Sequence, residues 1–162
     1  MTHTPPPRRS PEEQQRVEAA LRELFDQRIR FNEVLGLRTV SLDPQDYRMQ
    51  FDMRPDLVGH YLYGRLHGGV IAAALDAAGG NAVMLAMAEK HADETTEQVM
   101  HRFARLGTID MRIDYLRPGL GEHFTASAAV TKLGGRVASV QMRLSNQAGT
   151  LIATGAAAYI VS

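Results

Sequence analysis

The chain has 162 residues, enough for one domain with a substantial core. Its 18 basic side chains balance its 18 acidic ones, so no molecule-wide charge points to nucleic acid or an anionic membrane as a partner. It has no cysteine, which excludes disulfides, thiolate nucleophiles and cysteine metal ligands and is compatible with a cytoplasmic location. Metal-ligand spacing is absent among four of the histidines, His60, His91, His101 and His123. We therefore predict no metal, and we also predict no cofactor.

Residues 1–10 contain three prolines and two arginines but no apolar stretch, so they lack the pattern of a secretory signal. We expect a short flexible tail there and a single domain over residues 11–162. The run Ser10-Pro11-Glu12-Glu13 predicts a helix start, with serine as the cap, proline in the first turn and Glu13 completing a capping box.

Apolar residues at helical spacing continue this first helix to a point before Gly36. On its outer side, Glu18 and Arg22 stand one turn apart and are expected to pair. Two strands follow, Leu37–Leu42 and Tyr47–Met53, separated by a turn that contains proline. Together they predict a hairpin.

The most apolar segment, Val70–Met87, has only two polar side chains, Asp76 and Asn81. It is marginal in length for a membrane span, and a central aspartate costs about 2.5 to 3.5 kcal/mol on insertion scales. A buried core helix is therefore the better interpretation, and we expect no membrane span. We expect Asn81 to be a satisfied polar residue at the boundary between helix and sheet, and Gly79-Gly80 to permit close packing against the sheet.

The second half of the chain predicts a short helix near Thr95–Phe103 and then mainly strands. Alternating residues place these strands over Ile109–Tyr115, Phe124–Val130, Ala138–Leu144 and roughly Thr150–Val161, with Gly134-Gly135 as a hairpin turn. On this alternation, Thr108 lies on the opposite face from Ile109 and Met111. The expected fold class is α+β, with an antiparallel sheet wrapped round a long hydrophobic helix and an extra N-terminal helix.

Asp76 stands two turns inside the apolar helix, after the glycine-rich run Gly64-Arg65-Leu66-His67-Gly68-Gly69. Moving an unpaired carboxylate out of water costs several kcal/mol, so this side chain is either paired or functional. The structural alternative is a buried aspartate that acts as a cap or pairs with an arginine such as Arg102 or Arg112.

A series of landmarks begins with His67-Gly68-Gly69 and with Asp76, nine residues after the histidine. The later landmarks, in chain order, are Thr108–Pro118, Leu133–Ala138 and Asn146–Gly155. Together they resemble the hotdog-fold acyl-CoA thioesterases of the phenylacetate-pathway type over most of the chain. The segment Leu66–Gly80 is most similar to a bacterial branch that acts on medium- and long-chain acyl-CoA.

The resemblance implies hydrolysis of acyl-CoA to the free acid and CoA by a homodimer or homotetramer. It implies that Asp76 activates water as a general base, although direct attack to form an acyl anhydride is chemically open. The backbone N–H of Gly68, in the first turn of the helix, is the expected donor to the developing oxyanion of the other subunit's substrate. Thr108 is expected to hold the water near the carboxylate.

The remaining candidate residues concern substrate binding. His67 either contacts substrate or caps the helix through its ring, and Gly69 allows a bulky acyl-pantetheine to approach the backbone. Tyr61 stands where the family often has asparagine, so the orientation of the thioester depends on this position. By resemblance, the turn holding Gly135 and Arg136 lies near the nucleotide end of CoA, where Arg136 is placed to clamp a phosphate.

Two other functions are compatible with the same fold. A hotdog dehydratase or hydratase of 3-hydroxyacyl thioesters needs a histidine paired with an acid against the acyl carbons, whereas His67 stands at the glycine turn. A non-catalytic acyl-CoA-binding protein is the third possibility, and Tyr61 in place of asparagine is the feature that keeps it open.

Overall fold

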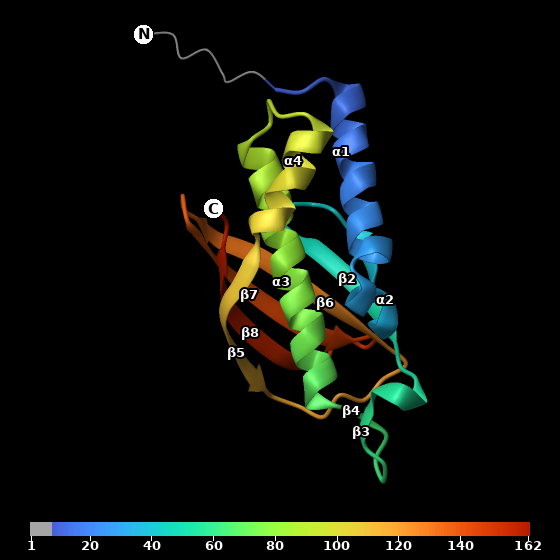
Figure 1. Cartoon of the computed structure of the whole chain (residues 1–162). Coiled ribbons are helices and arrows are strands. Elements are labelled where there is room, and N and C mark those ends of the chain that lie inside the picture. The colour runs from blue at the N-terminus through green and yellow to red at the C-terminus, as the bar shows by residue number, and fades with distance from the viewer. Residues whose placement is uncertain (1–7) are drawn as a thin grey trace.

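The computed structural model describes residues 8–162 and shows an antiparallel sheet curled round one long helix (Figure 1). The helices are α1 (Pro11–Glu23), α2 (Arg30–Leu35), α3 (Gly68–Lys90) and α4 (Thr96–Arg102), with a π-helical turn at Leu24–Arg28 and 3-10 turns at Pro55–Leu57 and Phe103–Arg105. The strands are β1 (Arg38–Ser41), β2 (Tyr47–Asp52), β3 (Val58–His60), β4 (Arg65–Leu66), β5 (Gly107–Tyr115), β6 (His123–Leu133), β7 (Val137–Asn146) and β8 (Leu151–Ile160). The predicted helices and long strands are confirmed, with shifts of a few residues at their ends.

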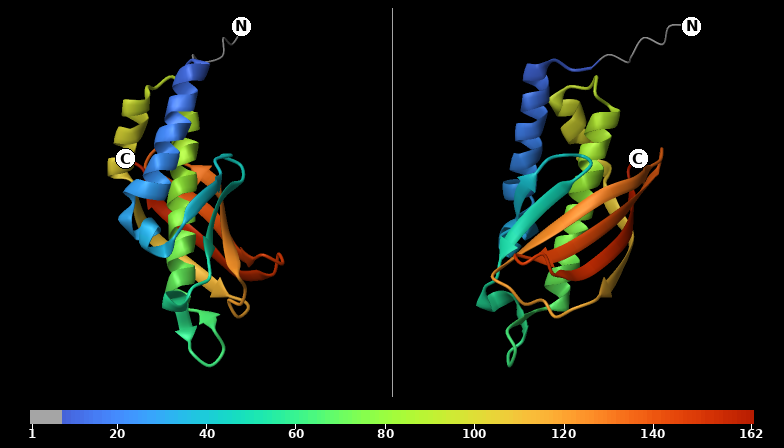
Figure 2. Two further views of the ribbon diagram at one scale, coloured as in Figure 1. Left: turned by 90° about the vertical axis from the view of Figure 1, so that its right-hand side faces the viewer. Right: turned by 180° about the vertical axis from the view of Figure 1, so that it is seen from behind.

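Six strands form the main sheet in the order β1-β2-β6-β7-β8-β5, and every neighbouring pair is antiparallel. The sheet covers one side of α3, as the view from behind shows most clearly (Figure 2). Apolar side chains of β7 point alternately into this core: Ala138, Val140, Met142 and Leu144 are buried. β1 and β5 are the two end strands, and each has one edge without a strand partner in the sheet.

The apolar helix α3 forms the centre of the molecule. By length and composition this helix is apolar enough to cross a membrane. However, 61% of its 18-residue apolar stretch is buried inside the fold. Its buried residues on the sheet side include Ala74, Leu75, Ala78 and Ala82. Because the sheet and the N-terminal helices take up its apolar surface, the prediction of a core helix is confirmed.

The predicted helix start is confirmed, but its capping box is only half formed. Ser10 Oγ accepts from the Glu13 N–H at 3.2 Å, as expected of a serine cap. The Glu13 carboxylate instead accepts from both the N–H and the hydroxyl of Thr96, each at 2.7 Å. The expected reciprocal bond is therefore replaced by one that joins α1 to the start of α4.

The helical segment ends at Gly36, which adopts a φ of 71° that favours glycine. The expected pair between Glu18 and Arg22 is wrong, because each residue has another partner. Glu18 accepts from Gln14 at 2.8 Å, and Arg22 donates to the backbone oxygen of Thr39 at 2.8 Å. Arg22 thereby satisfies a carbonyl of β1 and fastens the helix to the sheet.

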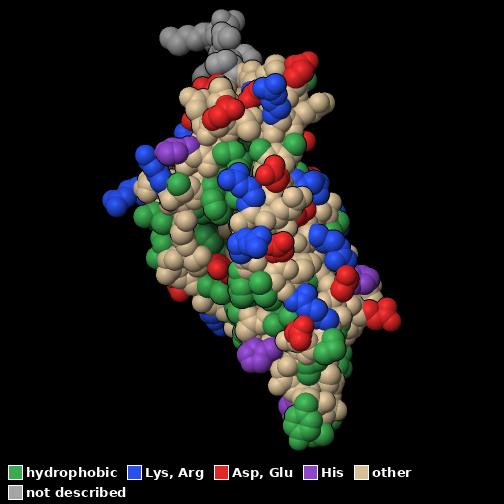
Figure 3. Space-filling view, turned by 45° about the vertical axis from the view of Figure 1, so that its right-hand side comes forward, with side chains coloured by type: hydrophobic (Ala, Val, Ile, Leu, Met, Phe, Trp, Pro, Cys, Tyr) green, Lys and Arg blue, Asp and Glu red, His purple; other side chains and the backbone are tan. Residues whose placement is uncertain are grey.

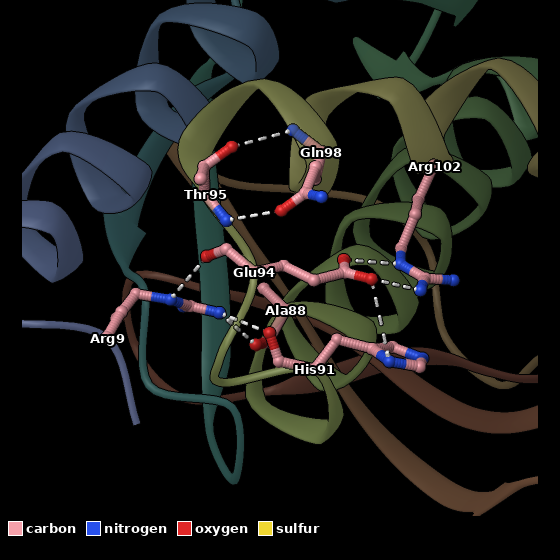
Figure 4. A network of polar contacts seen from close by, with 7 residues as sticks. All are labelled: Arg9, Ala88, His91, Glu94, Thr95, Gln98 and Arg102. Atoms are coloured by element: carbon pink, nitrogen blue, oxygen red, sulfur yellow. Dashed lines mark hydrogen bonds and ion pairs between the residues drawn. The ribbon is translucent and has the colours of Figure 1, made fainter. Parts of the chain in front are cut away.

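Arg8–Ser10 fall within the segment expected to be a flexible tail, but Arg9 fastens them to the C-terminal end of α3 (Figure 4). Its guanidinium donates to the carbonyl oxygens of Ala88 and His91, both at 2.7 Å. The last carbonyls of a helix have no partner inside it and lie at the negative end of its dipole. Arg9 is therefore fastened to the end of α3, and residues 1–7 of the predicted tail lie outside the described residues.

A small hairpin formed by β3 and β4 was not predicted from the sequence. It projects from the N-terminal end of α3, and hydrophobic side chains gather at its tip (Figure 3). Tyr61, Leu62 and Tyr63 there are all more than half exposed. Two-stranded hairpins of this size bury little surface on their own, so the sequence carries no strong periodic signal for it.

Candidate active site

Three side chains meet on the face of α3 that points toward β5 and β8. Thr108 Oγ1 donates to Asp76 Oδ1 at 2.9 Å. The Tyr159 hydroxyl lies 3.1 Å from the same carboxylate oxygen and 3.0 Å from the backbone oxygen of Asp76. The carboxylate is thus bound by two hydroxyl groups presented by neighbouring strands.

Thr108 reaches Asp76 because β5 contains a β-bulge. β5 is in register with β8 at Thr108, opposite Tyr159, and pairing resumes two residues later, so Ile109 is the extra residue. A bulge changes which face the residues on one side of it point toward. Thr108 therefore shares a face with Met111, and Ile109 points outward and is 56% exposed. The predicted face of Thr108, which assumed simple alternation, is wrong for this reason.

A pocket of about 230 Å³ opens beside the Asp76 carboxylate. Its apolar lining comes from the N-terminal helical segment, from α3 and from the stretch before β5: Ile29, Phe31, Ala73, Ala77, Phe103 and Leu106. Asp76 and Thr108 are part of the same lining. Such a site, apolar with a few converging polar groups, is the usual form of a small-molecule pocket.

The predicted structural alternative for Asp76, an ion pair with arginine, is wrong. Arg102 donates through Nε to Glu94 at 2.7 Å, and Arg112 donates to Asp114 at 2.9 Å. Within residues 8–162, no salt bridge involves Asp76. Over the same range, no three histidine or acidic side chains gather closely enough to hold a metal ion.

Two adjacent glycines of α3 have different surroundings. A Cβ at Gly79 would collide with the Tyr159 hydroxyl and would lie only 2.7 Å from Met142 Sδ, so this position requires glycine. A Cβ at Gly80 would make only ordinary contacts, 3.6 Å from the Tyr159 ring, and Gly80 lines the pocket. The prediction of close packing against the sheet is confirmed for Gly79, whereas Gly80 leaves space beside Asp76.

Asn81 is buried, with 2% of its surface exposed, and its amide donates to the Tyr47 hydroxyl at 2.8 Å. The prediction of a satisfied polar residue at the boundary between helix and sheet is therefore confirmed. Burial raises the pKa of Tyr47 to about 12, so its hydroxyl stays protonated at physiological pH. Asn81 also lines the pocket that holds Asp76.

The start of α3 is built by His67, which caps the helix. Its Nδ1 accepts from the Gly69 N–H at 2.9 Å, and a Cβ at Gly69 would lie 2.9 Å from that nitrogen. The expected alternative of a histidine that binds the helix backbone is confirmed. It also means that the Gly69 N–H is occupied, whereas for Gly68 only the carbonyl is engaged, accepting from Tyr115 at 3.1 Å. The Gly68 N–H makes no hydrogen bond within residues 8–162.

The other candidate residues lie away from Asp76. Tyr61 is 86% exposed at the tip of the β3–β4 hairpin and stacks on His60. Gly135 lies at the opposite end of α3, where it lines a larger cavity of about 670 Å³ together with Lys90 and Arg105. Arg136 is exposed in the same turn. Of the predicted site residues of one chain, the structure therefore brings Thr108 into contact with Asp76.

Tyr159 is the site residue that sequence reasoning missed. It follows three alanines near the end of β8, where a single large side chain in a small-residue strand resembles ordinary core packing. The only signal in the sequence is that Gly79, its counterpart on α3, belongs to a glycine pair. Burial is the main cause that raises the pKa of Tyr159 well above its ordinary value, and the nearby Asp76 carboxylate is the second. The phenol therefore remains a donor.

Comparisons with known proteins agree with this architecture. Residues 63–153 match the family model described as Thioesterase superfamily. The medium/long-chain acyl-CoA thioesterase YigI of Escherichia coli (strain K12) is 37% identical over 139 residues, which cover 86% of this chain and 90% of that protein.

Solved structures extend the likeness to the whole fold. A protein of Shewanella oneidensis related to the thioesterase superfamily is 38% identical, with a TM-score of 0.87 over 95% of this chain and 100% of that chain. A thioesterase family protein from Silicibacter pomeroyi, 22% identical, has a TM-score of 0.69 over 89% of this chain and 96% of that one, and shows the fold alone. With its sheet wrapped round α3, the chain has the hotdog fold and belongs to the thioesterase superfamily.

Proposed function

We propose that this protein hydrolyses acyl-CoA thioesters to the free acid and CoA. The observation that carries the proposal is the Asp76 carboxylate, which two hydroxyls hold in an apolar pocket and which forms no salt bridge within residues 8–162. A carboxylate among a few converging polar groups in an apolar pocket is typical of an active site. The named activity of the Escherichia coli relative supports CoA thioesters, of medium or long acyl chain, as the substrate class.

In the proposed reaction, Asp76 acts as a general base. It takes a proton from a water molecule whose oxygen attacks the thioester carbonyl, and the resulting oxyanion accepts a hydrogen bond from the Gly68 N–H. Collapse of this intermediate breaks the carbon–sulfur bond and releases CoA as the thiolate, which takes up the proton. Direct attack by Asp76, giving an acyl anhydride that water then opens, uses the same two groups.

One chain does not place these two groups together. Gly68 and Asp76 are eight residues apart on α3, which corresponds to about 12 Å along a helix. We therefore assign the two groups of each site to two subunits of a homodimer, with a homotetramer of paired dimers as the larger alternative. The free edge of β5, beside Thr108 and the exposed Ile109, supports this edge of the sheet as the dimer contact.

The two ends of the substrate are assigned to different parts of the molecule. The pocket beside Asp76 is apolar and is assigned to the acyl chain. The cavity at the other end of α3 includes Lys90, Arg105 and Gly135, and this supports the nucleotide end of CoA there, with the exposed Arg136 as a phosphate partner.

The start of α3 and the β3–β4 hairpin are assigned to positioning the thioester. His67 and Gly69 shape the first turn of α3, so their role is to present the Gly68 N–H rather than to react. Tyr61 is exposed and does not line the pocket that holds its own Asp76, so it is assigned to the substrate bound at the partner subunit. The cytoplasmic location stays a prediction from the sequence.

The deciding experiment replaces Asp76 with Asn, which keeps the size of the side chain and removes the base. We expect thiol release from decanoyl-CoA and palmitoyl-CoA to fall by about 10²- to 10⁴-fold. Asp114→Asn is the matched control, because this exposed aspartate of β5 forms an ion pair with Arg112 and does not line the Asp76 pocket. Circular dichroism must show that both variants are folded, and a D76N variant with unchanged turnover would refute the assignment.

The structure disfavours the hydratase alternative. That chemistry needs a histidine aimed at the acyl carbons, but His67 Nδ1 is occupied by the Gly69 N–H at the helix start. A purely binding function has no structural observation in its favour. Equilibrium binding measured beside thiol release separates it from catalysis, since a binding protein retains acyl-CoA without releasing thiol.

A further inference from the structure

The two oxygens of the Asp76 carboxylate have different surroundings. Thr108 Oγ1 donates to Oδ1 at 2.9 Å, and the Tyr159 hydroxyl shares its proton between Oδ1 at 3.1 Å and the Asp76 backbone oxygen at 3.0 Å. Within residues 8–162, no donor is bonded to Oδ2. One oxygen is therefore held by the protein, and the other is left for a water molecule.

Tyr159 reaches this position because of three independent features of the fold. It lies directly opposite Thr108 in the β5–β8 pair, so the two hydroxyls come from neighbouring positions on one face. Only 2% of its surface is exposed, which fixes the ring by packing. Its hydroxyl occupies the space that a side chain at Gly79 would fill, one helical turn from the carboxylate.

We infer that Tyr159 is a positioning residue for the catalytic base: with Thr108 it holds Oδ1 of Asp76 and so turns Oδ2 toward the attacking water. This inference rests on the proposed function of Asp76. The phenol is assigned no part in the bond changes, because its hydroxyl is engaged by Asp76. Its effect is to fix one orientation of the carboxylate.

The test is Tyr159→Phe, which retains the ring and its packing beside Gly79 but removes the hydroxyl. We expect kcat for decanoyl-CoA to fall by about 10- to 100-fold with little change in KM, because the ring that lines the acyl pocket is kept.

Tyr47→Phe is the matched control. Tyr47 is also a fully buried tyrosine of the sheet whose hydroxyl bonds to α3, but its partner is Asn81 rather than Asp76. This variant should lose comparable thermal stability while its kcat and KM stay close to the wild-type values. A Tyr159→Phe enzyme whose kcat falls no further than that of Tyr47→Phe would overturn the inference, because its hydroxyl would then have only a structural role.

The outcome is separable from that of the proposed function. If the Asp76→Asn enzyme keeps its activity, Asp76 is not the base, and the proposed function of Asp76 fails. Asp76→Asn without activity, beside a Tyr159→Phe enzyme with wild-type kcat, leaves Asp76 as the base and refutes only the role of Tyr159. Loss of kcat in both variants, with the kcat of Tyr47→Phe unaffected, supports both.

Discussion

At the scale of single residues, Gly79 and Gly80 show how neighbouring positions of one helix serve different purposes. Gly79 is required by close approach, because the Tyr159 hydroxyl and Met142 Sδ occupy the space beside its Cα. Gly80 faces the pocket, and a methyl group there would meet the Tyr159 ring at an ordinary 3.6 Å. Neither glycine has a positive φ, so the difference between them arises from packing and not from backbone conformation.

This difference predicts opposite effects of the same substitution on stability. Gly80→Ala should raise the free energy of unfolding by about 0.5 to 1 kcal/mol, because alanine is the better helix former and finds space. Gly79→Ala should lower it by about 1 to 3 kcal/mol through overpacking against Tyr159. Urea unfolding of both variants checks the prediction, and equal effects of the two substitutions would contradict it.

At the scale of elements, the N-terminal segment is joined to the core by polar side chains that reach across the chain. Arg9 binds carbonyls at the end of α3, and Glu13 binds the first turn of α4. Arg22 binds a carbonyl of β1. These contacts hold the segment that contributes Ile29 and Phe31 to the pocket beside Asp76, so they help to position one side of the site.

Arg9 should therefore matter more for stability than its place near the end of the chain indicates. Arg9→Ala removes a charged donor from the Ala88 and His91 carbonyls and should lower the free energy of unfolding by about 1.5 to 3 kcal/mol. Arg8→Ala is the control: Arg8 forms an exposed ion pair with Glu89, which is worth at most about 1 kcal/mol. Thermal and urea unfolding measure both, and indistinguishable variants would show that the Arg9 contacts add nothing.

At the scale of the whole molecule, the proposed site is divided between subunits, and a backbone substitution tests this division. Gly68 is the first residue of α3 and follows His67 at φ −64° and ψ 137°, a conformation that proline tolerates after it. Gly68→Pro should therefore remove the oxyanion donor without breaking the helix. Gly68→Ala keeps the N–H, and its Cβ would make an ordinary 3.5 Å contact with Tyr115.

Mixed dimers of Gly68→Pro with Asp76→Asn should recover activity that neither variant has alone. In such a dimer both substitutions fall in one site, and the other site has an intact Asp76 and an intact Gly68 N–H. Random exchange of subunits should restore about a quarter of wild-type thiol release, as expected for a twofold dimer. Gly68→Ala alone should remain active, and a mixture without any recovery would place both groups in one subunit.

Acid should destabilise the whole fold through carboxylates whose pKa values are lowered. The hydrogen bond from Arg102 holds the pKa of Glu94 below its ordinary 4.5, and the hydroxyl and N–H of Thr96 act in the same way on Glu13. A lowered folded-state pKa contributes stability that is present above about pH 4.5 and lost as the pH falls through the folded-state value. Urea midpoints measured from pH 7 to pH 3 should therefore decline below pH 4.5. Glu94→Gln should show a smaller decline, and an equal one would exclude this pair as a source.

The sequence predicted the order of helices and long strands well because each has strong periodicity or clear end signals, as at Ser10 and Gly36. It failed where one residue changes the geometry of a strand or where a partner is distant in the chain. The bulge at Ile109 reversed the face expected for Thr108, and no local pattern records it. Tyr159 was missed because a tyrosine among alanines has the same pattern whether it packs or supports a carboxylate.

The sequence by itself determined that one carboxylate would stand inside an apolar core helix after a glycine turn, since local hydrophobicity and capping depend on nearby residues alone. It also determined the order along the chain of the long strands that surround this helix. Only the tertiary structure decided what holds Asp76, because Thr108 and Tyr159 reach it from strands 32 and 83 residues further along the chain. Side-chain hydrogen bonds depend on distance in space, and the register of β5 against β8 sets that distance only when the sheet has formed.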